Sequence, residues 1–310
     1  MKASRYETNI FLQHAAVAAA LAASAPAWMK RPKARKIFLV GVGTNDNAAH
    51  MAAWLWSSAG LDARAVHGHD FVTRPYRLGR GDLGVFLSHG GGRSYTVLAE
   101  ALARKAGAET VVVTAQGSPW PGAARRLETG PREDTRAYTH SYTTTMVWLM
   151  RWAGTPSLLA PFKRVKRSLA WGPSFPTINE RTDLVLIGDG LREWVAREAA
   201  LKVLETSYLK VRAYGLEEFL HGPHVSVGRG STVVGFSAPG ARRWDAARSW
   251  LMGVGAPFTE VRSADLLAQV LWSQRLALAC CKRLGQNPDL LRGGSPRYAR
   301  ALAGQKTAAL

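Results

Sequence analysis

Cysteine is almost absent from this sequence: only Cys280 and Cys281 occur among its 310 residues. Two thiols make no disulfide framework of the kind that holds small secreted domains together. Both fall in an expected helix, where adjacent side chains diverge, so a disulfide between them is not expected. We interpret them as small buried residues of a protein in a reducing compartment.

Long apolar runs are also missing, since none reaches the roughly 18–20 residues needed to cross a bilayer. One segment resembles a secretory signal: Lys2 and Arg5 precede the alanine-rich run 15–23, and Ala25–Ala27 follows it like a cleavage site. The run is rich in alanine rather than leucine, and polar residues crowd its start. An amphipathic opening helix explains it as well. We expect no membrane association and a cytoplasmic protein, with secretion as the alternative.

Acidic residues are scarce, at 22 against 41 lysines and arginines, which gives a formal charge of +19. Such a surplus attracts anions, whether phosphorylated metabolites, nucleic acid or anionic membranes, without choosing among them. The densest basic runs, 30–36 and 163–167, are short, and short runs are typical of solvated surfaces. We therefore expect nonspecific but no specific nucleic-acid binding.

The sequence lacks complete nucleotide-binding fingerprints. Two Gly-x-Gly turns, 41–43 and 188–190, have Asp46 and Glu193 where the dinucleotide fingerprint requires a third glycine. No Gly-x4-Gly-Lys-Ser/Thr loop occurs. His67, His69 and Asp70 could hold a metal if they lay along a strand, where alternate residues share a face. Because this is one short cluster without a partner, we predict no metal site.

Alternating strands and helices are present twice over. The first half has apolar runs typical of strands at 37–40, 63–66, 84–87 and 110–113, and helical patterns at 48–56, 95–105 and 142–152. The second has strands at 184–187, 232–236 and 258–261, and helices at 191–206, 241–251 and 264–282. This order predicts an α/β fold of two similar lobes, each a parallel sheet flanked by helices in three layers.

Prolines between the halves indicate where one lobe ends. Four of them lie within 154–181, which is typical of a linker. We expect an N-terminal helical segment (1–36), a first lobe (37–160), a linker (161–182), a second lobe (183–285) and a C-terminal tail (286–310).

Polar turns follow several of the predicted strands. In open parallel sheets, ligands bind beyond the carboxyl ends of the strands. Hydroxyls, backbone N–H groups and helix N-termini in such turns form an anion site. His89 and His140 could contact the ligand or merely cap helices. The predicted substrate-binding residues are Gly43, Thr44, Asn45, Ser88, His89, Gly90, Arg93, Ser94 and Thr139.

A stretch of the second half carries a family resemblance: 200–208, Ala213-Tyr214, Glu218 and His221-Gly222-Pro223. It resembles the isomerase part of glucosamine-fructose-6-phosphate aminotransferase, a member of the sugar isomerase (SIS) family. Weaker similarities in the first half lie at 41–45, 69–71, Ser88 and 139–143. We expect no glutaminase domain, because about 36 residues precede the first strand. Use of ammonia, release of an amine, or no nitrogen chemistry all stay open.

The resemblance implies an aldose–ketose isomerase, or a deaminating isomerase, acting on an amino-sugar or ketose phosphate through an enediol. Glu205 matches the family's base, His221 the residue that opens the sugar ring, and Lys202 a lysine near the sugar. It further implies no cofactor and a homodimer in which the histidine comes from the neighbouring subunit. Two plainer interpretations stay open: Glu198 and Lys202 form an ordinary surface pair at i,i+4, and His221 shapes a turn.

Two departures from the family favour an alternative, a sugar-phosphate sensor without turnover. Gly90 replaces the second serine of the phosphate loop, and Arg93 falls where its last hydroxyl is expected unless Ser94 takes that place. Arg93 could bind phosphate through its planar fork. Near the C-terminus, Arg300 stands where the family has an active-site lysine, and Lys306 has the wrong offset.

Overall fold

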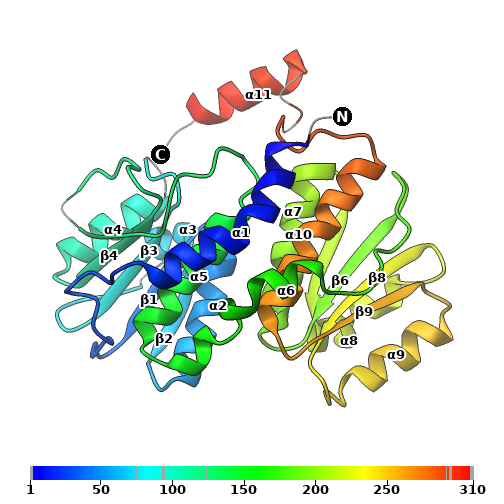
Figure 1. Cartoon of the computed structure of the whole chain (residues 1–310), viewed down its shortest axis with the longest axis horizontal. Coiled ribbons are helices and arrows are strands. Elements are labelled where there is room, and N and C mark those ends of the chain that lie inside the picture. Colours follow the sequence, from blue (N-terminus) through cyan, green and yellow to red (C-terminus); the bar gives the residue numbers. More distant parts are fainter. Residues whose placement is uncertain are drawn as a thin grey trace. The chain divides into compact units, whose positions relative to one another are not determined.

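The computed structural model describes residues 3–74, 76–92, 95–122, 124–290, 292 and 295–307. The chain divides into two compact units, each with its own parallel sheet (Figure 1). One comprises 12–134, 138–163 and 292–310 and holds five strands; the other comprises 1–11, 135–137 and 164–291 and holds four. We call them the five-stranded and the four-stranded unit.

The five-stranded unit has the strand order β2-β1-β3-β4-β5, with every neighbouring pair parallel. A helix connects most successive strands, as parallel pairing requires. In chain order its elements are β1 (Ile37–Gly41), α2 (Thr44–Ser58), β2 (Ala63–His67), α3 (Gly68–Thr73), β3 (Leu83–Leu87), α4 (Tyr95–Lys105), β4 (Glu109–Thr114), β5 (Arg125–Glu128) and α5 (His140–Ala153).

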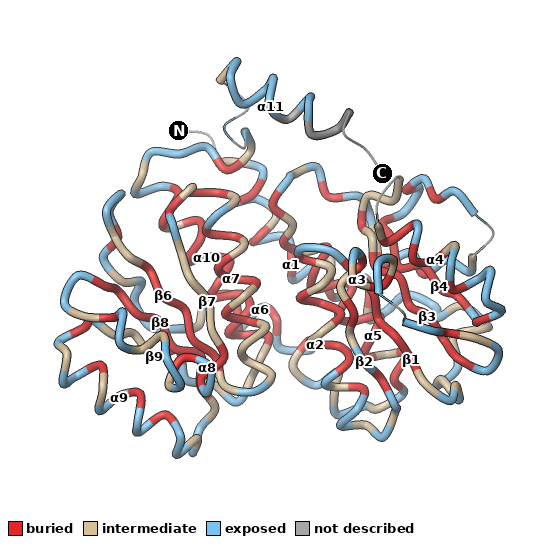
Figure 2. The backbone as a smooth tube through the Cα atoms, turned by 180° about the vertical axis from the view of Figure 1, so that it is seen from behind, coloured by how far each residue is buried: buried red, intermediate tan, exposed pale blue. Residues whose placement is uncertain are grey.

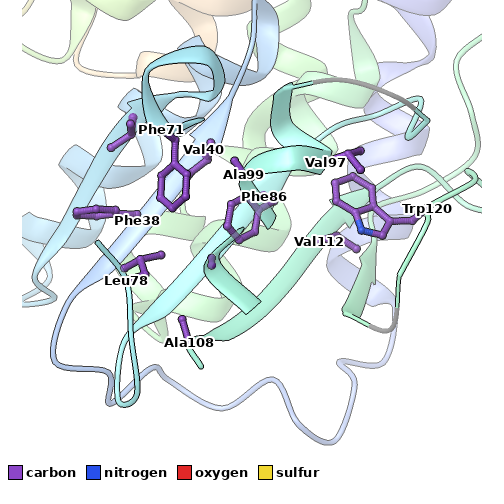
Figure 3. Packing of buried hydrophobic residues seen from close by; sticks show 12 residues of the cluster. Phe38, Val40, Phe71, Leu78, Phe86, Val97, Ala99, Ala108, Val112 and Trp120 are labelled. Carbon is purple, nitrogen blue, oxygen red and sulfur yellow. The ribbon is translucent and has the colours of Figure 1, made fainter. Parts of the chain in front are cut away.

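Apolar residues cover both faces of this sheet. On one face, alternate strand residues such as Phe38 and Phe86 form a cluster with residues of α3 and α4 (Figure 3). The intervening residues, such as Leu39 and Val85, are equally buried on the other face, where α2 lies. Burial on both faces explains why the central strands are continuous apolar runs.

The four-stranded unit repeats this plan with the order β7-β6-β8-β9, again all parallel. Helices α8 and α9 contribute to an apolar cluster on one face of the sheet, while α7 packs against β6, β7 and α10. Its elements are α6 (Val165–Ala170), β6 (Asp183–Gly188), α7 (Arg192–Ser207), β7 (Val211–Gly215), α8 (Leu216–His221), β8 (Ser231–Ser237), α9 (Trp244–Gly253), β9 (Phe258–Arg262) and α10 (Leu266–Arg283).

The opening segment forms helix α1 (Arg5–Ala22), whose apolar stripe is part of the buried interior (Figure 2). Tyr6, Ile10 and Val17 are fully buried at helical spacing. Buried Gln13 accepts a hydrogen bond from the Thr143 hydroxyl at 3.0 Å. A last helix, α11, spans Pro296–Thr307. Throughout the described residues, no helix is both long and apolar enough to cross a bilayer.

The predicted α/β fold with two parallel sheets is confirmed. The sequence did not reveal β5, β7, α3 or α8, and the interval 154–181 holds α6 and two short 3₁₀ turns, Pro156–Leu159 and Phe162–Arg164. The strand geometry considered for a metal at His67 and His69 is wrong, because β2 ends at His67 and α3 begins at Gly68.

Both cysteines lie in α10, free of disulfides and buried. Burial raises the pKa of Cys280 to about 12 and that of Cys281 to about 11, which keeps both thiols protonated at neutral pH.

A glycine ends the first strand of each sheet for a steric reason. A Cβ at Gly41 would overlap the backbone of Asn45, and a Cβ at Gly188 would overlap the backbone of Arg192. The first turn of the following helix lies directly on the strand end. The second glycine of each turn has a positive φ, 62° at Gly43 and 50° at Gly190, which glycine adopts without strain. The Gly-x-Gly repeat is thus a repeated strand-to-helix turn.

We predict that Gly188→Ala lowers the free energy of unfolding by at least about 1–3 kcal/mol, because the added methyl forces backbone apart. Gly253→Ala, at the end of α9 with no atom within 4 Å of its Cβ, should cost nothing measurable. Urea unfolding of both variants tests this, and equal midpoints would contradict the steric explanation.

Candidate functional site

Two predicted ligand turns lie at the same edge of the five-stranded sheet. Strands β1 and β3 are parallel neighbours, with Val40 opposite Phe86, so their carboxyl ends meet. The chain leaves β1 toward β2 on one side and returns to β3 on the other, which makes this edge the topological switch point. Gly43, Thr44 and Asn45 follow β1, and the loop 88–92 follows β3.

The turn after β1 leads into the N-terminus of α2. Gly43 precedes the helix, and its carbonyl accepts hydrogen bonds from the amides of Asp46 and Asn47 at 2.9 and 3.1 Å. Thr44 is buried and Asn45 half-buried. The helix dipole favours an anion here. The Asp46 carboxylate in the first turn, 3.8 Å from His50 Nε2, already supplies part of that negative charge.

The loop after β3 is fixed through its main chain. The Ser88 amide donates to Val113 at 3.0 Å. The His89 carbonyl accepts from the Ala115 amide at 3.1 Å and from the Ser118 hydroxyl at 2.7 Å. Gly91 has a φ of 61°, and a Cβ there would overlap Pro119. These contacts determine the course of 88–91. The predicted Arg93 and Ser94 lie outside the described residues.

A buried carboxylate, Glu133, joins this loop to the start of α5. It accepts hydrogen bonds from the amides and hydroxyls of Thr139 and Ser141, at 2.6 to 3.0 Å. Its own amide donates to His89 Nε2 at 3.1 Å. Burial alone would raise the pKa of Glu133, but nearby His140 and the hydrogen bonds from Ser141 and Thr139 lower it overall. Glu133 therefore caps α5 as an anion while holding the His89 ring.

The contact with Glu133 determines the tautomer of His89. A backbone amide can only donate, so Nε2 must accept and the ring proton sits on Nδ1. Burial lowers the pKa of His89 to about 4, although Glu133 opposes this shift. The side chain is thus a neutral donor near pH 7. Within the described part of the chain, buried Nδ1 has no hydrogen-bond acceptor. Predicted Thr139 is fully buried, and its hydroxyl donates to Glu133.

The predicted catalytic helix face lies on α7 in the four-stranded unit. Lys202 Nζ is 2.7 Å from the Glu205 carboxylate and 3.5 Å from that of Glu198. Lys202 and Glu198 are fully buried, whereas the Glu205 side chain is 29% exposed. The interpretation of Glu198 and Lys202 as a solvated surface pair is therefore wrong. The three charges form one buried group with a single carboxylate that reaches the surface.

His221 lies elsewhere in this unit, exposed at the C-terminal end of α8. It borders a pocket of about 360 Å³ together with Glu217, Glu218, Leu220 and Arg243. Arg243 forms two hydrogen bonds with Glu217 there, at 2.5 and 2.9 Å. His221 lies on α8, whereas Lys202 and Glu205 lie on α7.

Comparison with known families and structures identifies the kind of domain and the fold. Residues 32–152 match the model of the SIS domain family. The chain carries a SIS domain. This domain corresponds to the five-stranded sheet and helices α2 to α5, and the resemblance to the SIS family predicted from the sequence is confirmed.

A curated relative is glutamine–fructose-6-phosphate aminotransferase [isomerizing] of Methanothermobacter thermautotrophicus, which is 26% identical over 220 residues. The match covers 66% of this chain but only 37% of that protein, so the chain spans about a third of its relative.

Solved structures share the fold of nearly the whole chain. A glucosamine-6-phosphate deaminase of Thermotoga maritima superposes with a TM-score of 0.77 at 19% identity, covering 93% of this chain and 97% of its own. The C-terminal domain of glucosamine-fructose-6-phosphate aminotransferase from Francisella tularensis gives 0.73 at 18% identity, covering 93% and 98%.

Sequence reasoning missed Glu133 in the SIS domain. It lies in a loop with alternating charges, where a buried acid does not stand out. One signal was available: it precedes Thr139 and the start of α5 by a few residues, and an anion near a helix N-terminus is stabilising.

We predict that His89 makes the fold sensitive to mild acid. The unfolded histidine takes up a proton near its ordinary pKa of about 6.5, and the folded one only near about 4. The contribution of His89 to the free energy of unfolding, about 3 kcal/mol, is complete above pH 6.5 and is lost as the pH falls toward 4. The pKa values of Glu133 and Glu260 are lowered, so these two carboxylates lose their contributions to stability only as the pH falls below the ordinary pKa of a carboxylate.

Chemical denaturation between pH 7 and 4.5 tests this prediction. The His89→Gln variant should show a flatter dependence of stability on pH than the native protein, and His69→Gln, which removes an exposed imidazole, should leave it unchanged. Parallel native and His89→Gln curves would contradict it.

We also predict that Lys202→Met destabilises the four-stranded unit by about 3–5 kcal/mol, because it withdraws the ammonium from fully buried Glu198. Glu205→Gln should cost less than about 1 kcal/mol, since its side chain is partly exposed. Thermal unfolding of both variants measures the difference. Similar stabilities would show that the buried charges do not support the fold.

Proposed function

We propose that this protein is a sugar-phosphate aldose–ketose isomerase or deaminating isomerase that acts on an amino-sugar or ketose phosphate through an enediol. The relatives named above act, by their names, on glucosamine 6-phosphate and fructose 6-phosphate, and both substrates belong to this class.

One observation carries the proposal: the 2.7 Å contact between fully buried Lys202 and partly exposed Glu205 on α7. A lysine buried beside two carboxylates is held in one place, since leaving that position would strand Glu198 without its cation. Lys202 in turn orients Glu205. A carboxylate held this way, with one side open to solvent, suits a base that must meet a substrate carbon.

The proposed reaction follows from these positions. Glu205 removes the proton from the carbon beside the carbonyl of the open-chain sugar, and electrons move onto the carbonyl oxygen to give an enediol. The positive charge of Lys202 offsets the developing negative charge. The proton of the neighbouring hydroxyl passes to the former carbonyl oxygen, and return of the proton from Glu205 to the former carbonyl carbon forms the new carbonyl and completes isomerisation. We assign ring opening to His221, whose imidazole exchanges protons between solvent and a sugar hydroxyl.

The phosphate-binding residues are proposed at the β1/β3 switch point. The Ser88 hydroxyl and the amides of His89 and Gly90 supply donors, together with Thr44 and Asn45 at the start of α2. Thr139 has a positioning role in this proposal, because its hydroxyl is bonded to Glu133. Arg93, Ser94 and Gly43 remain predicted binding residues.

We further propose a cytoplasmic homodimer in which His221 of one subunit serves the other's site. The exposed position of His221, apart from the Lys202 group, is compatible with this arrangement. The proposed chemistry needs no metal or organic cofactor, because a positioned base and a cation suffice for enediol formation.

A second candidate function is a sugar-phosphate sensor without turnover. It is favoured by Arg300, which stands where the family has a lysine and lies exposed on α11.

Proton NMR of fructose 6-phosphate and glucosamine 6-phosphate in heavy water tests the function. The native protein should exchange the C1 or C2 proton with solvent, and Glu205→Gln should slow this exchange about 100-fold or more. Glu180→Gln is the matched control, because it replaces an exposed carboxylate that lies outside the loops after β1 and β3. Broadening of the ligand signals without proton exchange would support the sensor. The absence of both broadening and exchange would show that these sugars are not its ligands.

A further inference from the structure

The phosphate loop has an open position at Gly90. A Cβ built there would lie 3.9 Å from the Tyr138 hydroxyl and 4.0 Å from Arg132 Nη2, both ordinary contact distances. A side chain would therefore fit, yet the sequence has none. Two polar groups from the segment before α5 border this space instead.

The main chain of Arg132 is held in place, whereas its guanidinium is exposed. Its neighbour Glu133 is anchored by the amides and hydroxyls of Thr139 and Ser141, which holds the main chain at this point. The guanidinium is exposed, and no acidic group among the described residues pairs with it. Its charge also acts on His89, since it contributes to lowering the pKa of that ring. Arg132 is thus an unneutralised cation beside the loop.

His89 adds a second, independent indication of a ligand. Its side chain is only 5% exposed, its Nε2 is occupied by the Glu133 amide, and its Nδ1–H has no acceptor in the described part of the chain. A buried donor without an acceptor costs free energy unless a ligand or water takes the bond. The His89 and Tyr138 rings are 4.5 Å apart, so the ring that carries this donor contacts the tyrosine that borders the space at Gly90.

We propose that Arg132 binds the substrate's phosphate in place of the loop hydroxyl that Gly90 lacks, with His89 Nδ1–H as a neutral second donor. This inference rests on the proposed function and assigns a phosphate monoester dianion as the group recognised. A guanidinium offers two parallel N–H donors to phosphate oxygens, which a single hydroxyl cannot. Gly90 then serves to keep the space open for the fork.

Calorimetric titration with fructose 6-phosphate tests the assignment. Arg132→Gln should weaken binding about 10- to 100-fold, the loss of one charged hydrogen-bonding group. Arg132→Lys, which keeps the charge without the fork, should lie between. In the Arg132→Gln background, Gly90→Ser should recover about 3- to 10-fold, because the hydroxyl returns to a position with room for it.

Arg80→Gln is the matched control, because it removes the same charge from an exposed arginine in the loop before β3, at the opposite end of the strands. Its affinity should stay within twofold of native. If Arg80→Gln and Arg132→Gln lost the same affinity, the effect would come from net charge alone, and the assignment would be overturned. Full loss in Arg93→Gln with none in Arg132→Gln would overturn it in favour of Arg93.

Inorganic phosphate as a second ligand separates this inference from the proposed function. Phosphate binding that depends on Arg132, with no binding or exchange of either sugar phosphate, would sustain the anion site and refute the sugar chemistry. If Arg132→Gln left the proton exchange of the sugar phosphates unchanged, the proposed function would stand and the assignment of Arg132 would be refuted. Thermal unfolding of each variant ensures that a loss of binding is not a loss of fold.

Discussion

The close approach of a helix to the end of the first strand in each unit is the constraint on which the site depends. Gly41 and Gly188 permit it, because any Cβ there would overlap the backbone of the next helix. In the five-stranded unit, this turn brings the α2 N-terminus to the sheet edge where the loop after β3 begins. The proposed anion-binding edge thus follows from the course of the main chain, independently of the side chains that line it.

Much of the fold could be predicted because burial leaves a direct mark on sequence. Strands such as β1 and β6 are buried along almost their whole length and are therefore unbroken apolar runs. Strand β5 has a single buried residue, Leu127, and β7 is mostly half-buried, so neither gives such a run. Helix α3 was missed for another reason: its six residues are too few to show a helical period.

The candidate site was predictable where its residues lie close in sequence. Lys202 and Glu205 share a helix face by spacing alone, and the structure joins them. Burial of Glu198 was not predictable, because the same i,i+4 pattern is common on surfaces. The link among His89, Glu133 and Thr139 spans segments about 44 residues apart and arises from tertiary packing. Arg132 becomes a candidate binding residue only through that packing, so it could not be predicted from the sequence.

The central claim is that the β1/β3 edge of the SIS domain holds the phosphate of a sugar phosphate. A crystal structure of the Glu205→Gln variant with fructose 6-phosphate tests it most directly, since slowed turnover preserves the ligand. The account predicts phosphate oxygens within hydrogen-bonding distance of Ser88 and the amides of the following loop. A phosphate bound beyond the carboxyl ends of the four-stranded sheet, with the β1/β3 edge empty, would contradict it.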